Sequence, residues 1–149
     1  MARPFRLQVL LDITQQRVDA ATSELQRLHA RWREAQSELD QLQAENTEYS
    51  AGLDARLARG ISMHRVHDYR LFLGELARAI QAHREEVDRR RQAWEEGHAR
   101  WLGLRQRHQS LAVLARRHSS SEALVEARRE QKAQDEVALK AAKEPPFHG

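Results

Sequence analysis

The sequence is short of the residues that build cross-linked, compact or sheet-rich domains. Its 149 residues include no cysteine, six glycines, three prolines and 5% aromatic residues. Without cysteine there is no disulfide, no thiolate metal ligand and no thiol nucleophile, which fits a reducing compartment. A single compact core of this length needs more Phe, Tyr, Val and Ile than the chain supplies, which argues against a sheet fold.

Long hydrophobic runs are missing as well. The longest fully apolar stretches are as short as residues 9–11 and 111–115. These stretches are shorter than the core of a signal peptide and much shorter than a membrane span. We therefore expect neither of these segments.

Charge is abundant but nearly balanced between the two signs. Charged residues make up 32% of the chain, with 25 basic against 22 acidic residues and a net charge of +3. The densest basic run, Arg89-Arg90-Arg91, is interleaved with acidic residues. We interpret it as an ion-paired face open to solvent, and no nucleic-acid partner is predicted.

What the sequence does contain is a long heptad pattern in two parts. Within each part, seam residues recur at alternating intervals of three and four, which is typical of a coiled coil. The first seam consists of Leu7, Leu11, Thr14, Val18, Ala21, Leu25, Leu28, Trp32, Ala35, Leu39, Leu42, Asn46, Tyr49 and Leu53, and the second of Val66, Tyr69, Leu73, Leu76, Ile80, His83, Val87, Arg90, Trp94, Gly97, Trp101, Leu104, His108 and Leu111. Because the second seam contains histidine, arginine and glycine, we expect the half of the hairpin away from the turn to be less stable.

One break separates the two seams. Gly60 can adopt the left-handed conformation that ends a helix, and Ser62 can cap the start of the next one. We therefore predict an all-α fold, a long two-helix antiparallel coiled-coil hairpin with a C-terminal helical overhang. The expected single unit, residues 1–149, has a helix over about 4–58, a turn at 59–62, a helix over about 63–143 and a disordered tail at 144–149.

A short antiparallel turn also determines which residues face each other. Folding about Gly60 pairs residues whose numbers sum to about 121, which places Trp101 opposite Ala20 and Ala21. Residues from about 115 onward then have no partner from the first helix. We expect this overhang to be helical, and to fray at its end unless another protein packs on it.

Neither catalytic nor metal-binding chemistry is indicated. His64, His67 and Asp68 lack a further ligand in an enclosed pocket. Paired carboxylates such as Glu85-Glu86 lie on a helix face open to water, where a carboxyl group keeps an ordinary pKa. Since a two-helix arm also offers no cleft, we predict no enzymatic activity, no cofactor and no metal.

Two stripes near the turn are apolar or aromatic. Phe72 lies outside the seam, at a g-like position that a two-stranded arm leaves uncovered. Such a residue either docks a partner or folds over the edge of the seam. The stripes consist of Leu42 and Tyr49 on the first helix and of Phe72, Leu76, Ala79 and His83 on the second.

A last pattern combines the break, the start of the second seam and a charged string near the C-terminus. Its residues are Gly60-Ile61-Ser62, Val66, Tyr69, Phe72-Leu73, Leu76, Ala79-Ile80, Trp94, Arg128-Arg129-Glu130-Gln131-Lys132 and Asp135-Glu136. Together they resemble the FliJ family of flagellar type III export proteins over nearly the whole chain. The charged string is the most specific part, because coiled-coil composition alone does not produce it at that place.

The resemblance implies a non-enzymatic, soluble, cytoplasmic component of the flagellar type III export apparatus, peripherally associated with the inner membrane at the flagellar base. It implies a stalk like the γ-subunit of rotary ATPases, with its terminal end in the hexameric export ATPase and its turn-proximal face on the cytoplasmic domain of the export gate. The gate contacts it implies are Leu42, Tyr49, Phe72, Leu76, Ala79 and His83, and the ATPase contacts are Arg128, Arg129, Gln131, Lys132, Asp135 and Glu136. Glu38 and Glu45 are acidic where the family tends to carry uncharged or aromatic residues.

Other functions stay open at this point. One is an export chaperone or escort that binds other export subunits through the overhang and the exposed stripe. Others are an injectisome stalk protein, or a generic coiled-coil scaffold that dimerises through the imperfect second seam. The hairpin prediction itself implies a monomer.

Overall fold

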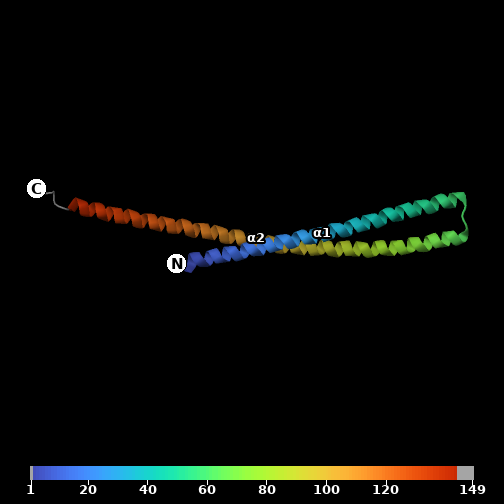
Figure 1. The fold of residues 1–149 in the computed structure, drawn as a ribbon, viewed down its shortest axis with the longest axis horizontal. Helices are drawn as coiled ribbons and strands as arrows, with labels where there is room; N and C mark the ends of the chain where they lie inside the picture. The colour runs from blue at the N-terminus through green and yellow to red at the C-terminus, as the bar shows by residue number, and fades with distance from the viewer. Residues whose placement is uncertain (1, 144–149) are drawn as a thin grey trace. The chain divides into compact units, whose positions relative to one another are not determined.

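Two long helices make up the fold. In the computed structural model, which describes residues 2–143 and the side chains of residues 6–143, α1 spans Ala2–Arg59 and α2 spans Met63–Lys143 (Figure 1). No strand occurs within residues 2–143. The all-α prediction of two antiparallel helices is confirmed, whereas the predicted disordered tail at 144–149 lies outside the described residues.

The turn between the helices has the predicted chemistry. Gly60 has a φ of 88°, and its N–H donates to the Leu57 carbonyl at 3.3 Å. The Ser62 hydroxyl accepts a hydrogen bond from the Arg65 backbone N–H at 3.3 Å. Glycine adopts this backbone conformation without a steric penalty, and a serine cap satisfies a backbone donor that the first turn of a helix leaves free. Both local predictions are confirmed.

By compactness, the chain divides into two units. We call Val18–Gly103 the turn unit, and Met1–Arg17 with Leu104–Gly149 the terminal unit. Each unit pairs a segment of α1 with a segment of α2.

The core of the turn unit follows the two seams. Leu39, Leu76 and Ile80 form a buried cluster against which Leu42 and Val87 pack. All predicted seam residues are buried or half-buried except one, Tyr49, which is 44% exposed. The heptad prediction is therefore confirmed for burial, and it is wrong at Tyr49.

All three tryptophans of the chain gather in one ladder of aromatic rings in the turn unit. The centroids of Trp32 and Trp94 are 5.5 Å apart, and His98 lies 5.1 Å from Trp94 and 5.7 Å from Trp101. His29 contacts Trp32 and Trp94 at 6.0 and 6.2 Å. Such spacings are within the range of favourable ring contacts.

Two contacts within this region show how large and small side chains alternate. The Trp101 indole N–H donates to the Thr22 hydroxyl at 3.0 Å, one residue beyond the predicted Ala21. Gly97 is buried, and a Cβ built there would lie 2.7 Å from Leu28 Cδ1. The glycine that the sequence suggested as a weak point of the seam therefore leaves room for the Leu28 side chain.

In the terminal unit, the pairing of the two helix segments ends before α2 does. Thr14 is buried and lies 2.8 Å from His108, in agreement with the predicted register. His118 is the last half-buried residue of α2, and residues 119–143 are all exposed. Figure 1 shows α2 continuing past the N-terminal end of α1 within this unit.

Candidate protein-docking surfaces

The stripe that we predicted as the gate contact is on the turn unit. Phe72, Leu76, Ala79 and His83 follow intervals of four, three and four along α2, so they share one helix face. Leu76 is only 7% exposed and belongs to the core cluster, which leaves little of its side chain for a partner. Ala79 and His83 are half-buried.

An exposed aromatic pair spans the two helices of this stripe. The rings of Tyr49 and Phe72 lie 4.7 Å apart at 56°, and the two residues are 44% and 41% exposed. Phe72 therefore neither joins the core nor stands alone, because it leans on Tyr49 at the edge of the seam. The pair offers an aromatic surface that two elements hold in place.

A shallow hollow with acidic walls lies along the same stripe. It is lined by Glu38, Gln41, Leu42, Glu45 and His83. His83 Nδ1 lies 3.7 Å from Glu38 Oε2, and this ring nitrogen is buried without a hydrogen-bond partner among the described atoms. A buried polar atom without a hydrogen-bond partner is unfavourable. The sequence analysis did not single out Gln41, because nothing in its residue type or position marks it as a binding residue.

The second predicted surface, on the overhang of α2, is fully exposed. All of its predicted residues lie on the helix beyond the pairing with α1, and Gln131 donates to Asp135 at 3.0 Å within that helix. A hollow on this segment also includes residues that the sequence did not single out. The residues that line it are Lys132, Asp135, Glu136, Leu139, Lys140 and Lys143.

The overhang continues the heptad line of α2 with different residue types. Continuing the intervals of three and four from His118 leads to Glu122, Val125, Arg129, Lys132, Glu136, Leu139 and Lys143. In the paired part of α2 this face is mostly apolar, whereas here it alternates between charges of both signs and single apolar residues. This face therefore suits a partner with matching charges better than it suits a second apolar helix.

The basic run of α2 is ion-paired, as predicted. Arg89 and Arg90 contact Glu86 at 2.6 and 2.7 Å, and Arg91 contacts Asp88 and Glu95 at 2.6 and 2.8 Å. The hydrogen bonds from Arg90 and Arg89 lower the pKa of Glu86. The bond between Arg90 and Glu86 also raises the pKa of Arg90. Our expectation of an ordinary pKa at Glu86 is therefore wrong.

We next consider a metal site and a membrane span among the described residues. His64 lies 3.6 Å from Asp68, and both side chains are open to solvent. Within residues 2–143 no group of three or more His, Asp or Glu side chains is placed to hold a metal ion. Among the described residues, no helical stretch is long and apolar enough to cross a bilayer.

Comparison with known proteins then identifies the family. The profile of the family described as Flagellar FliJ protein matches residues 3–145. The chain belongs to the FliJ family. Two proteins named Flagellar FliJ protein, from Salmonella typhi and Escherichia coli (strain K12), are each 30% identical to it over 146 residues, which cover 98% of this chain and 99% of each relative. No solved structure matches the chain.

Membership of the FliJ family gives the coarse function. The protein is a component of the flagellar protein export system, and the family is a non-catalytic one. The match favours the flagellar interpretation over the injectisome stalk that the sequence left open.

Proposed function

We propose that this FliJ-family protein is a stalk that links the hexameric flagellar export ATPase to the cytoplasmic domain of the export gate. In this proposal the overhang of α2 enters the ATPase ring, and the stripe near the turn docks the gate. The protein binds no nucleotide itself, and it acts in the cytoplasm at the inner face of the membrane.

The observation that carries the proposal is the overhang. Residues 119–143 form a continuous helix that is exposed on every side, although isolated helices are marginal in water. Arg129, Lys132 and Glu136 lie on the face that contacts α1 elsewhere in the protein. A ring that surrounds the helix supplies the missing partner, and opposite charges then determine the register.

The stripe near the turn supports the second contact. The Tyr49–Phe72 pair provides exposed aromatic area, which is the residue type enriched at interface hot spots. Next to it, the acidic hollow and the unpartnered His83 nitrogen provide polar specificity. Leu76 belongs to the core cluster and Leu42 packs against it, so the two leucines anchor the stripe to the core.

Two binding measurements test the proposal. The full-length protein is titrated into the export ATPase and, separately, into the cytoplasmic domain of the gate. We expect charge reversal at Arg129 and Lys132 to weaken ATPase binding only, and Phe72→Ala to weaken gate binding only. Arg78→Glu, on an exposed part of α2 outside both surfaces, serves as the control. An ATPase whose assembly and turnover do not change on addition of the protein contradicts the stalk role.

A second candidate, an escort for export subunits or chaperones, rests on a different observation. Four apolar residues of the overhang, Leu124, Val125, Val137 and Leu139, are exposed. Exposed apolar side chains on an unpaired helix can bind an amphipathic segment of another protein. A stalk binds with one copy per hexamer, whereas an escort binds single export subunits in the absence of the ATPase. Sedimentation of the mixtures distinguishes the two.

A further inference from the structure

We propose that the tip of the turn unit, residues 55–67, binds the surface of an anionic lipid bilayer. The tip comprises the last turn of α1, the connecting residues and the first turn of α2. This proposal goes beyond the stalk role and does not depend on it.

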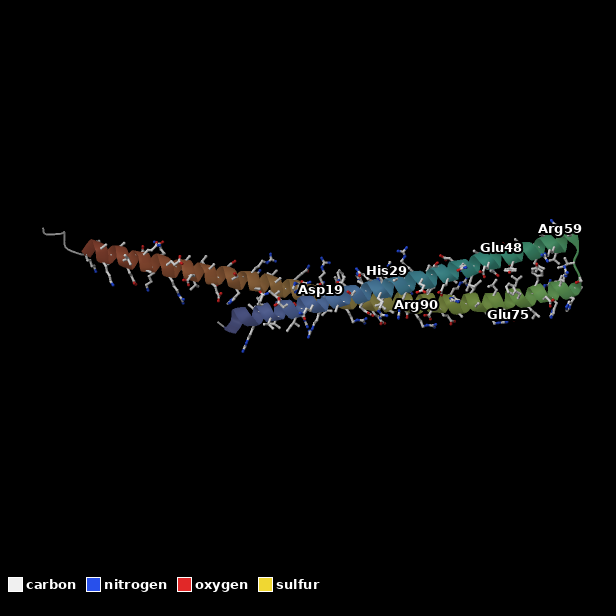
Figure 2. The ribbon with its side chains drawn as sticks, viewed as in Figure 1. Asp19, His29, Glu48, Arg59, Glu75 and Arg90 are labelled. Carbon is white, nitrogen blue, oxygen red and sulfur yellow. The ribbon has the colours of Figure 1, made fainter. Side chains whose placement is uncertain are left out.

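Three arginines concentrate positive charge at the tip. Residues 55–67 include Arg56, Arg59 and Arg65 and no acidic residue. They are flanked by Asp54 and by Asp68, which lies 3.6 Å from His64. Arg56 lies over the ring of Tyr69 at 5.3 Å, whereas Arg59 and Arg65 are exposed and their side chains form no ion pair among the described residues. Figure 2 shows Arg59 at the end of α1, beside the turn. Arginines in such a cluster attract anionic headgroups.

Apolar side chains project from the same tip. Met63, the first residue of α2, is 77% exposed, and Leu57 on the last turn of α1 is also exposed. Scattered exposed apolar residues are ordinary on a protein surface, but these two lie among arginines. Apolar side chains that enter the acyl boundary while basic groups stay at the headgroups are the pattern of interfacial membrane binding.

The shape of the tip favours a bilayer over an acidic protein. Gly60, Ser62 and Met63 are all exposed, so the surface projects outward at the turn. A rigid protein needs a fitted pocket to bury Met63 and Leu57, whereas a bilayer deforms around them. Carboxylates of an acidic protein would pair with the arginines but leave both apolar residues in water.

The absence of cysteine allows a site-specific test on the full chain. Met63→Cys is labelled with a polarity-sensitive dye and mixed with vesicles of equal parts phosphatidylcholine and phosphatidylglycerol. Ala82→Cys, exposed on α2 away from the tip, is the control. We expect a blue shift at position 63 with the anionic vesicles and no shift with pure phosphatidylcholine or at position 82. A shift of equal size at both positions overturns the proposal.

A second measurement separates the tip from general charge attraction. Arg59→Gln with Arg65→Gln removes the same charge as Arg78→Gln with Arg84→Gln, and circular dichroism verifies that both pairs remain helical. At low salt we expect the tip pair to lower partitioning onto anionic vesicles by roughly 20-fold and the control pair by less than about twofold. Equal losses, absence of vesicle binding by the unaltered chain, or tip binding to polyglutamate but not to vesicles each overturns the bilayer assignment.

Discussion

The Thr14 hydroxyl lies 2.8 Å from His108 Nδ1, and this contact links two residues that are 94 positions apart in the sequence. Thr14 is only 5% exposed, and its hydroxyl also donates to the Leu11 carbonyl at 3.1 Å. Because a hydroxyl has one hydrogen, the His108 ring donates through Nδ1 and Thr14 accepts. This bond fixes the register of the terminal unit.

Loss of one partner in this pair is expected to destabilise the terminal unit. Thr14→Val leaves the half-buried His108 Nδ1 without this partner, at a cost of about 1–3 kcal/mol in the free energy of unfolding. His108→Leu is expected to cost less, because the Thr14 hydroxyl keeps its bond to the Leu11 carbonyl. The double variant removes both groups and is expected to cost less than the sum of the single changes. Urea unfolding of the four proteins measures the coupling, and strictly additive effects contradict the bond.

The close approach at Gly97 predicts a contrast with Gly103. Alanine favours a helix over glycine by about 1 kcal/mol, and a Cβ at Gly103 has nothing within 4 Å. At Gly97 the Cβ meets Leu28 at 2.7 Å, so this side chain has to move. We expect Gly97→Ala to be less stable than Gly103→Ala by about 1–3 kcal/mol in urea unfolding. Equal stabilities imply that Leu28 adapts freely.

Phe72 and Ile80 lie on the same helix, but their substitution by alanine is expected to affect stability and gate binding differently. Ile80 is in the buried cluster, so Ile80→Ala is expected to lower the free energy of unfolding by about 2–5 kcal/mol. Phe72→Ala removes a partly exposed ring and is expected to cost about 1 kcal/mol or less. Its larger effect is expected on gate binding, measured by calorimetry. A similar loss of stability in both variants contradicts the division into core and docking residues.

Hydrogen exchange is expected to separate the paired and unpaired parts of α2. Residues 119–143 lack contacts that protect a helix from local opening, so their amides are expected to exchange much faster than those around Leu76 and Ile80. Addition of the export ATPase is expected to slow exchange in this segment alone. Strong protection of residues 119–143 in the free protein contradicts an unpartnered overhang.

Acid is expected to weaken the ion-paired face of α2. The folded pKa of Glu86 lies below the ordinary 4.5, because Arg90 and Arg89 donate hydrogen bonds to its ionised form. The stabilisation is therefore complete above about pH 4.5 and is lost as the pH falls through the lowered pKa. Melting temperatures of the unaltered protein and of Glu86→Gln, measured from neutral pH downward, are expected to converge in acid. A constant difference contradicts this account.

Much of the fold was predictable because the heptad repeat reports which side of each helix is covered. Val66 and Ile80 are buried as predicted. Gly60 ends α1 and Ser62 caps α2, and both roles follow from the short sequence at the turn. Tyr49 escapes the pattern, because its ring packs on Phe72 at the edge of the seam.

The candidate surfaces were less predictable, because they depend on cross-helix neighbours. Leu76 packs in the core, as its seam position indicates, and Phe72 is partly exposed outside the seam. The contact of the Phe72 ring with Tyr49 on the other helix is what the sequence did not reveal. The hollow beside His83 forms only when residues of α1 come next to α2. The length of the exposed segment, in contrast, followed from the turn position and the register alone.

The ring ladder has a consequence for experiments on this protein. Since Trp32, Trp94 and Trp101 are the only tryptophans and all lie in the ladder, the intrinsic emission of the protein comes from one short part of the turn unit. Neither proposed docking surface contains an indole. A change in tryptophan emission when a partner binds to the overhang therefore reports a rearrangement that reaches the ladder, while unchanged emission indicates that the surroundings of the three indoles stay as they are.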